Sequence, residues 1–362
     1  MIAFKLATPA LALVTALTLA GCVSPQAVTA PAPQASAAAP TIPALLADLG
    51  ANVILPTYRD LDERAATMHQ AALALQTATT EANLLAARDA WKAARLSWEL
   101  SESHLLGPVK DQDLDPALDS WPVNGTDLDK VLAGSDAFSE AYIAGQQPTL
   151  KGFHVIEYVL FAHQPAQLDA RKLAYLTALT GEFRTNAKTL RQAWEPTGGN
   201  FLAQYAQPTP GSAFGTSEVA FAETLQALAE ICEEVANAKI EAPLAAQDVG
   251  LEESRYSVNS LEDFRHNLTG VKDVYLGRHG DRQGLGLSHL IAAKDPALDT
   301  RMRTLIDQAL ADLNAVPGSF AEAIVKHPDS LRKAQGSINA VRSALQKDVS
   351  LSLTGKVVDD AT

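Results

Sequence analysis

The sequence predicts an all-α protein built as two related helical bundles. Its longer segments are rich in Ala, Leu, Glu, Gln and Arg, the residues that form helices most readily. Apolar residues recur in them at helical spacing, as at Leu84, Trp91 and Trp98, and no segment alternates apolar and polar residues as a half-buried strand would. Amphipathic helices joined by short connections bury their apolar faces by packing as bundles.

The predicted helices follow one another along most of the chain, and Pro, Gly, Asp and Asn cluster between them. Proline and glycine interrupt helices, so we expect Gly107-Pro108 and the run Glu195–Gly199 to end two of the segments. The helices are predicted over residues 44–79, 82–106, 149–163, 168–195, 216–239, 258–276, 296–316 and 330–351.

A short pattern that occurs twice predicts an internal duplication. Gly152–Leu160 and Gly270–Leu276 each place a glycine before an apolar helix, and two long helices precede each of them at similar distances. We therefore predict a first bundle over residues 42–164, a second over 165–352, and a tail over 353–362. The boundary is coarse, because one long helix could serve both bundles.

The N-terminus carries the features of a bacterial lipoprotein. A short region with one lysine precedes the apolar run Leu6–Leu19, which is too short to span a bilayer and is typical of a signal peptide. The run ends in Leu19-Ala20-Gly21-Cys22, which resembles a lipobox. Residues 1–21 are thus predicted to be removed and Cys22 to carry the lipid; an ordinary signal peptide with a chance cysteine is the alternative. Residues 22–41 form a tether rich in Pro and Ala.

This N-terminus predicts where the protein resides. Acyl chains on the cysteine would hold the chain at a membrane surface. We expect the folded part on the periplasmic face of the cell envelope or at the cell surface. The outer membrane is favoured, because Val23 rather than Asp follows the cysteine.

Composition limits the classes of partner. The chain has 362 residues, of which 47% are hydrophobic, enough to bury a large core. There are 29 Lys and Arg residues against 42 Asp and Glu residues, and the net charge of −13 excludes nucleic acid as the partner, because a phosphate backbone requires a basic surface. The same charge attracts cations. With only Cys22 and Cys232, the chain has neither a disulfide scaffold nor a cysteine-rich metal site.

The chemistry of the sequence is concentrated in His154-Val-Ile-Glu157. Residues three apart share one face of a helix, so the imidazole and the carboxylate can point at the same spot. The helix around them is apolar on all sides, and a charge buried there must be paired or bound to a metal. Two interpretations follow: a hydrogen-bonded His–Glu pair that fixes helix packing, or two ligands of a metal site.

Standard catalytic motifs are absent from the sequence. HExxH does not occur, and HxxEH fails because Tyr158 stands where its second histidine would be. There is no GxSxG, P-loop or GxGxxG motif. The glycine-rich run Gly284–His289 does not follow a strand, so it is predicted to be a loop.

Several segments together resemble one protein family. Gly152-Phe-His154-Val-Ile-Glu157 is similar to the GxHxxE signature of the imelysin-like family, which includes insulin-cleaving membrane proteases and EfeO-type iron-uptake lipoproteins. The likeness covers about residues 44–350 and extends to four more segments, which are Trp91–Pro108, Asp119–Asp129, Ser254–Phe264 and Gly270–Gly277. The resemblance implies a helical fold of two domains that arose by duplication, the GxHxxE motif in a cleft between them, and a link to iron.

The resemblance also implies further site residues. Glu102, in the Trp/Arg/Glu helix of the family, is the first candidate for a third metal ligand beside His154 and Glu157. Glu99 could lie on the same face, or it could pair with Arg95 one turn earlier.

Other family-like positions are candidates for lining the cleft. Asp129 and Asp263 could line it, or they could cap helices. Trp121 and Tyr256 could contact a ligand, or they could be core aromatic residues. Carboxylates with one imidazole suit iron as Fe(II) or Fe(III), and Zn(II) or Cu(II) is possible.

Three functions remain open at this level. The first is a lipid-anchored protein that binds an iron ion or an iron chelate between two helical bundles and presents it to an iron-uptake permease. The second is a metallopeptidase that uses the same HxxE site, and whether the protein is an enzyme stays uncertain. The third is an interaction protein that binds no metal and in which His154 and Glu157 form a structural pair.

Overall fold

The computed structural model describes residues 40–357. The predicted signal peptide (1–21), the lipidation site Cys22 and nearly all of the tether lie outside this part, as does the end of the predicted tail. Within residues 40–357, no helix combines the length and the apolar character that crossing a membrane requires.

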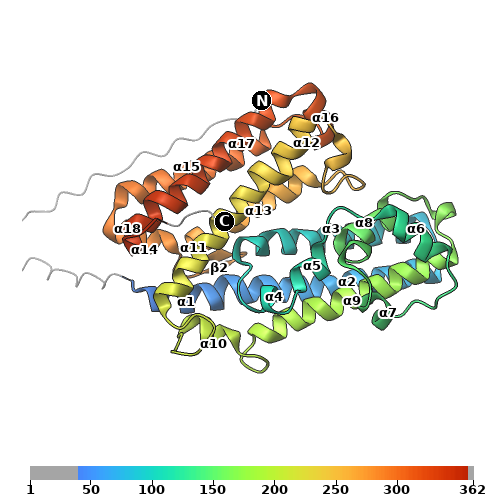
Figure 1. The fold of residues 1–362 in the computed structure, drawn as a ribbon, viewed down its shortest axis with the longest axis horizontal. Helices are drawn as coiled ribbons and strands as arrows, with labels where there is room; N and C mark the ends of the chain where they lie inside the picture. The colour runs from blue at the N-terminus through green and yellow to red at the C-terminus, as the bar shows by residue number, and fades with distance from the viewer. Residues whose placement is uncertain (1–39, 358–362) are drawn as a thin grey trace, which may run out of the picture. The chain divides into compact units, whose positions relative to one another are not determined.

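The helices of the first half pack around the long helix α2. The described part of the chain begins with α1 (Ile42–Leu49), which passes through a π-helical turn, Gly50–Ile54, directly into α2 (Leu55–Thr77). Helix α2 packs side by side with α3 (Glu81–Ser101) and α9 (Ala170–Trp194), as Figure 1 shows. Helix α8 (Gly152–Phe161) packs against both α3 and α9, which buries the apolar surface predicted around His154.

Short helices that the sequence pattern does not predict lie between α3 and α8. The last turn of α3 tightens into a 3₁₀ turn, Glu102–His104, before Gly107-Pro108. Then come α4 (Pro108–Asp111), α5 (Leu114–Asp119), α6 (Gly125–Ala133) and α7 (Glu140–Ala144). Each is too short for helical periodicity to be visible in the sequence. Helix α5 packs on α8 and α9, so its C-terminal end reaches the site.

The second half builds another layer of helices. After α10 (Phe201–Ala206), helix α11 (Ser217–Glu233) continues through a π-helical segment, Glu234–Ile240, into α12 (Glu241–Ala246). The remaining helices are α13 (Ser260–Leu276), α14 (Leu287–Lys294), α15 (Pro296–Asn314), α16 (Phe320–Lys326), α17 (Pro328–Ser343) and α18 (Ser350–Thr354). Helix α15 packs on α13 and α17, and α17 also packs on α11.

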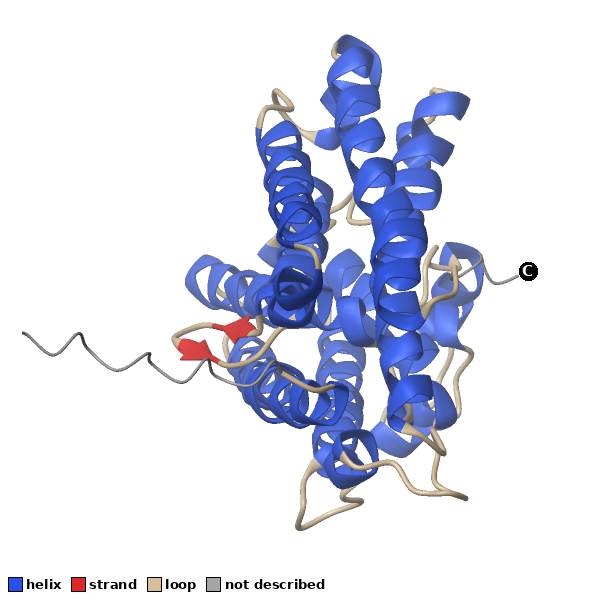
Figure 2. Ribbon diagram, turned by 90° about the vertical axis from the view of Figure 1, so that its left-hand side faces the viewer, coloured by secondary structure: helices blue, strands red, loops and turns tan. Residues whose placement is uncertain are grey.

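The structure corrects the prediction for the glycine-rich segment. Two short strands, β1 (Arg278–His279) and β2 (Arg282–Gln283), pair as an antiparallel hairpin, visible in Figure 2. The predicted loop over Gly284–His289 ends sooner than expected, because α14 already begins at Leu287. The strands of the described residues have two residues each, so the predicted all-α class is confirmed.

The two layers meet where α3 packs against α13. A side chain at Gly270 would place its Cβ 2.4 Å from the carbonyl oxygen of Leu100, so glycine is what lets the two helices approach so closely. Helix α9, which the prediction assigns to the second bundle, packs on α2 and α8. The duplication and its boundary after residue 164 remain predictions.

Candidate metal site

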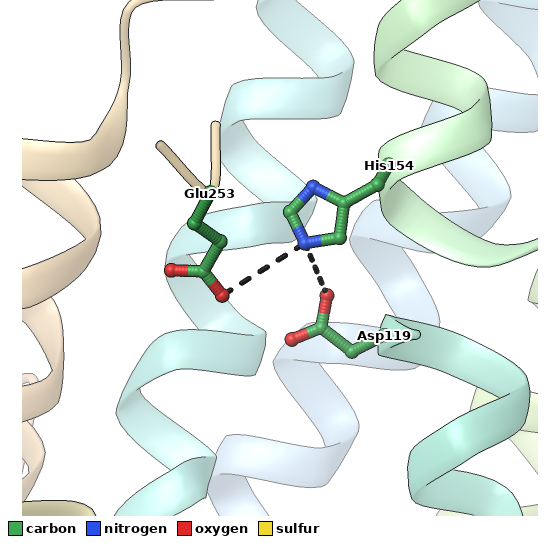
Figure 3. A group of neighbouring side chains, drawn as sticks. All are labelled: Asp119, His154 and Glu253. Carbon is green, nitrogen blue, oxygen red and sulfur yellow. Dashed lines mark ion pairs between the residues drawn. The ribbon is translucent and has the colours of Figure 1, made fainter. Parts of the chain in front are cut away.

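His154 lies at the centre of a buried group of charged side chains. It is 1% exposed, and its Nδ1 atom lies 3.3 Å from Oε2 of Glu157. Its Nε2 atom lies 3.2 Å from Oδ1 of Asp119 and 3.8 Å from Oε1 of Glu253, so two carboxylates converge on the same nitrogen (Figure 3). Asp119, His154 and Glu253 each bring one possible ligand atom within 4.8 Å of the other two.

Glycine in the GxHxxE motif explains how Asp119 reaches the histidine. Gly152 begins α8 with a φ of 78°, a conformation that favours glycine. A Cβ atom at this position would lie 2.5 Å from the carbonyl oxygen of Leu118. The missing side chain therefore lets the end of α5 lie against the first turn of α8, which places Asp119 beside His154.

Glu253 comes from the turn that precedes α13, and Glu157 fastens that turn to α8. One carboxylate oxygen of Glu157, Oε1, accepts three hydrogen bonds: from the backbone N–H of Tyr256 at 3.0 Å, from the backbone N–H of Ser257 at 2.8 Å, and from the Ser257 hydroxyl at 2.8 Å. The other oxygen faces Nδ1 of His154. Glu157 thus holds both the imidazole and the segment that carries Glu253.

This geometry separates the two residues of the HxxE motif by role. Glu157 lies behind the imidazole, on the Nδ1 side, where a carboxylate orients a metal-binding histidine. Nε2 faces Asp119 and Glu253 instead. The role of metal ligand predicted for Glu157 remains a prediction, and the arrangement favours Asp119 and Glu253 in its place.

Asp119 and Glu253 are not among the site residues predicted from the sequence. A signal was present, because Asp119 opens the family-like segment Asp119–Asp129 and Glu253 directly precedes the family-like segment Ser254–Phe264. Neither residue stands in a helical pattern that links it to His154. Only the packing of α5 and of the turn before α13 brings the three residues together.

Arg95 binds the carboxylates from the side of α3. Its guanidinium is fully buried and pairs with Glu99 at 2.5 Å, with Glu253 at 2.9 Å and with Asp119. Glu99 therefore pairs with Arg95 one turn earlier, which is the alternative role predicted for it. The Trp98 indole N–H donates to Oδ2 of Asp119 at 2.6 Å, which holds this carboxylate from a second direction.

Glu102, the predicted third ligand, lies in the neighbouring part of the cluster. Its Oε2 atom lies 3.2 Å from the Lys239 ammonium and accepts a hydrogen bond from the Asn267 amide at 2.7 Å. It forms a possible ligand group with Glu99 and Asp119, a group that does not include His154. Its role as a metal ligand stays a prediction.

The other predicted binding residues divide into two sets. Asp263 is buried in the first turn of α13 and accepts a hydrogen bond from Asn259 at 2.7 Å, so it belongs to the cluster. Trp121 and Tyr256 border the cavity beside His154. Asp129 is exposed on α6, outside the buried cluster.

The cluster holds more negative than positive groups. Six carboxyl groups are buried in it with the two permanent cations Arg95 and Lys239 and with His154; they belong to Glu99, Glu102, Asp119, Glu157, Glu253 and Asp263. Burial raises the pKa of Asp263 to about 6 and also raises the pKa of Glu99, in both cases against the attraction of Arg95. An added cation would relieve this excess.

His154 responds to the same excess. Burial opposes a charged imidazole, but the side chains of Asp119 and Glu157 outweigh burial and raise the pKa of His154 to about 9. The two carboxylates therefore favour the imidazolium form of His154, which carries a proton on each ring nitrogen. A metal ion that binds Nε2 would displace the proton on that atom.

Several polar atoms of the cluster have no hydrogen-bond partner among the described residues. They include Nε2 of His154, whose approach to Asp119 lacks hydrogen-bond alignment, and Oε2 of Glu253. Buried polar atoms in proteins are normally satisfied, and an ion is one reason for an exception. One imidazole nitrogen with two or more carboxylate oxygens is a donor set that fits iron, zinc and similar cations.

Two cavities adjoin these atoms. The smaller, of about 10 Å³, is bordered by His154, Glu157 and Glu253, and it has room for one particle of the size of a water molecule. The larger is a cleft of about 320 Å³ that is bordered by Asp119, Glu253 and Lys239, among others. Glu253 and Trp121 border both cavities, so the two adjoin; the smaller one, beside His154, is called the inner cavity below, and the larger one the outer cleft.

Fold and site together define a helical protein with a carboxylate-rich candidate metal site. The family model described as Imelysin matches residues 54–347. Iron-regulated protein A of Synechococcus elongatus is 30% identical over 303 residues, which cover 82% of this chain and 83% of that protein. The chain belongs to the imelysin family, as the GxHxxE motif predicted.

Solved structures agree with this assignment. A protein from Parabacteroides distasonis, provisionally described as an iron-regulated protein A precursor, has a similar structure with a TM-score of 0.79 and 25% identity, covering 88% of this chain and 97% of that one. An imelysin-like protein from Psychrobacter arcticum has the same fold, with a TM-score of 0.74 and 16% identity over 90% of this chain and 100% of that one.

Proposed function

We propose that this protein binds an iron ion through Nε2 of His154 and the carboxylates of Asp119 and Glu253, and that it acts in iron acquisition outside the cytoplasm. The observation that carries the proposal is the buried Nε2 atom, which lacks a hydrogen-bond partner and faces two carboxylates. The similarity to proteins named iron-regulated protein A supports the connection to iron.

The donor set supports iron over softer metals. Carboxylate oxygens are hard ligands that suit Fe(III) and Fe(II), while one imidazole is acceptable to iron, zinc and copper. Among residues 40–357 the one cysteine, Cys232, lies in the hydrophobic core, and burial raises the pKa of its thiol to about 12, so it offers no thiolate to the site. Zn(II) and Cu(II) remain the competing metals for the titration.

The small inner cavity supports a free ion rather than a chelate as the bound form. A space of about 10 Å³ accepts a single atom of ligand or water beside His154, not an organic chelator. A chelate could approach only as far as the outer cleft of about 320 Å³.

The location and partners belong to the same proposal. We infer that Cys22 carries a lipid that anchors the chain on the periplasmic face of the envelope, with the outer membrane favoured, or at the cell surface, and that the iron passes to an uptake permease. Support comes from the lipobox-like Leu19–Cys22 and the apolar run before it. Labelling of the cells with a radioactive fatty acid, compared with a Cys22→Ala variant, tests the anchor directly.

The metal site is tested by titration of the chelator-stripped protein with Fe(II), Fe(III), Zn(II) and Cu(II). We expect one equivalent of iron to bind wild type and a His69→Ala control, in which the lost histidine contacts Thr180 instead of the cluster. His154→Ala should lose this binding, and Asp119→Asn should weaken it strongly. Wild type that binds none of these metals, with far-ultraviolet circular dichroism showing a folded protein, would overturn the proposal.

A metallopeptidase is the second candidate, and the three converging residues are what favours it. Three protein ligands with one open position are the usual arrangement of a catalytic zinc. Against it, the inner cavity has no room for a peptide carbonyl beside a metal-bound water. Zinc-dependent cleavage of an unfolded protein substrate, lost in His154→Ala, would establish this function instead.

A further inference from the structure

Lys239 is a buried lysine in an unusual piece of helix. Its side chain is 5% exposed, and it lies in the π-helical segment Glu234–Ile240. In such a segment residues five apart share a face, and Nζ of Lys239 indeed lies 3.4 Å from the half-exposed Glu234 carboxylate. Single π-helical turns inside α-helices occur frequently at functional sites.

The Lys239 ammonium competes for the same oxygen that faces His154. Oε1 of Glu253 lies 3.1 Å from Nζ of Lys239, 2.9 Å from Nη2 of Arg95 and 3.8 Å from Nε2 of His154. Two buried cations therefore hold the oxygen that a metal at His154 would need. A metal ion can bind Glu253 fully only by weakening these ion pairs.

Of the two cations, Lys239 is the one that can yield. Arg95 is fully buried and also binds Glu99 and Asp119, so its position is fixed from several sides. Lys239 borders the outer cleft together with Glu253. Its ammonium also pairs with Glu102 at 3.2 Å, so it keeps a buried counter-ion after Glu253 moves to a metal.

We propose that Lys239 is a positioning residue that competes with the bound metal for Glu253, and that it keeps metal binding weak enough for release. This inference rests on the proposed function. It names the cargo as a multivalent cation, because a monovalent ion offers Glu253 no more charge than the lysine it would replace. A carrier must give up its cargo, and a built-in cation that retakes the ligand oxygen provides a path for that exchange.

The test compares Lys239→Met and Lys239→Arg with a control, Lys326→Met, which removes the same charge from an exposed ion pair on α16. We expect the metal affinity of Lys239→Met to rise by about tenfold or more, and its release to an external chelator to slow correspondingly, because one competing charge is gone. Lys239→Arg, which keeps the charge, and Lys326→Met should remain within about threefold of wild type.

The direction of the change separates this role from a structural one. A lysine that only supported the fold would, on removal, misplace Glu253 and weaken metal binding. If Lys239→Met without metal melts below the assay temperature, Lys239→Gln replaces it in the test. The glutamine keeps a hydrogen-bond donor without the charge, and its metal affinity should rise in the same way. Folded variants without the lysine charge that bind metal as wild type does, or more weakly, overturn the inference.

The metal titrations of wild type and His154→Ala distinguish a failure of the proposed function from a failure of this inference alone. If wild type binds metal and His154→Ala does not, the metal site stands whatever the result at position 239. If wild type binds no metal, both the site and the role of Lys239 are refuted together.

Discussion

Replacement of Gly152 by alanine tests the link between backbone packing and the site. The φ of 78° at Gly152 costs a residue with a side chain about 1–2 kcal/mol. A Cβ atom 2.5 Å from the Leu118 carbonyl oxygen must push α5 away from α8, and overpacking of this kind costs about 1–3 kcal/mol. The two costs together predict that Gly152→Ala lowers the free energy of unfolding by about 2–5 kcal/mol, a large part of the total stability of a typical domain.

The same substitution should also weaken metal binding. Leu118 directly precedes Asp119, so a displaced α5 moves this carboxylate away from Nε2 of His154. Urea unfolding, monitored by circular dichroism, measures the stability. An iron titration at a urea concentration below the unfolding transition, where the variant is still folded, measures the affinity. The matched control is Gly336→Ala on α17, where an added Cβ meets no atom within 4 Å and should stabilise the helix by about 0.5–1 kcal/mol.

Two results would refute this reasoning. If Gly152→Ala unfolds at the same urea concentration as wild type, the close approach of α5 to α8 is not what the glycine provides. If the variant loses stability but binds iron with unchanged affinity, Asp119 does not depend on that approach for its place beside His154.

Three further predictions concern the charges and the backbone of the site. Because the pKa of His154 is raised to about 9, metal affinity should increase from pH 6.5 towards pH 9 and level off above pH 9. Without metal, the same pKa shift stabilises the fold fully below pH 6.5, and this stabilisation is lost as the pH rises through 9. A metal affinity that stays constant from pH 6.5 to 9 would contradict the role of His154 as a ligand. Arg95→Met removes the buried guanidinium that Glu99, Asp119 and Glu253 share, and it should lower the free energy of unfolding in urea by about 3–5 kcal/mol. Arg332→Met, which removes an exposed ion pair, should change it little. Val258, in the turn after Glu253, has a φ of 58°, a backbone conformation that strains a residue with a side chain. Val258→Gly should therefore raise the free energy of unfolding by up to about 1 kcal/mol. An equal gain for Val258→Ala would show that backbone strain is not the cause.

Long helices were predictable because their signal is local and repeated. Helices α9 (Ala170–Trp194) and α15 (Pro296–Asn314) match segments predicted over 168–195 and 296–316, since many turns of apolar spacing all indicate the same face. Helix α5, with six residues, contributes too few positions for such a pattern. Its omission hid Asp119, which is its last residue.

The site was predictable only where a residue contradicts its surroundings. His154 and Glu157 stand out because a polar pair in an apolar helix requires a partner or a metal. Asp119 and Glu253 lie in polar segments where a carboxylate is ordinary, so their types alone indicate nothing. Lys239 resembles any lysine of an amphipathic helix, and only the structure shows that it is buried in a π-helical segment.

The amino-acid sequence by itself determined the helical class, the family and the central histidine of the candidate site, because these depend on periodicity and on one short motif. The tertiary structure alone decided which side of the imidazole each carboxylate occupies. Glu157 lies on the Nδ1 side with His154 on the same helix, whereas Asp119 and Glu253 reach Nε2 from α5 and from the turn before α13. Contacts between segments far apart in the chain depend on how helices pack. Here the close approach at Gly152 brings α5 to α8, and hydrogen bonds to Glu157 hold the turn before α13.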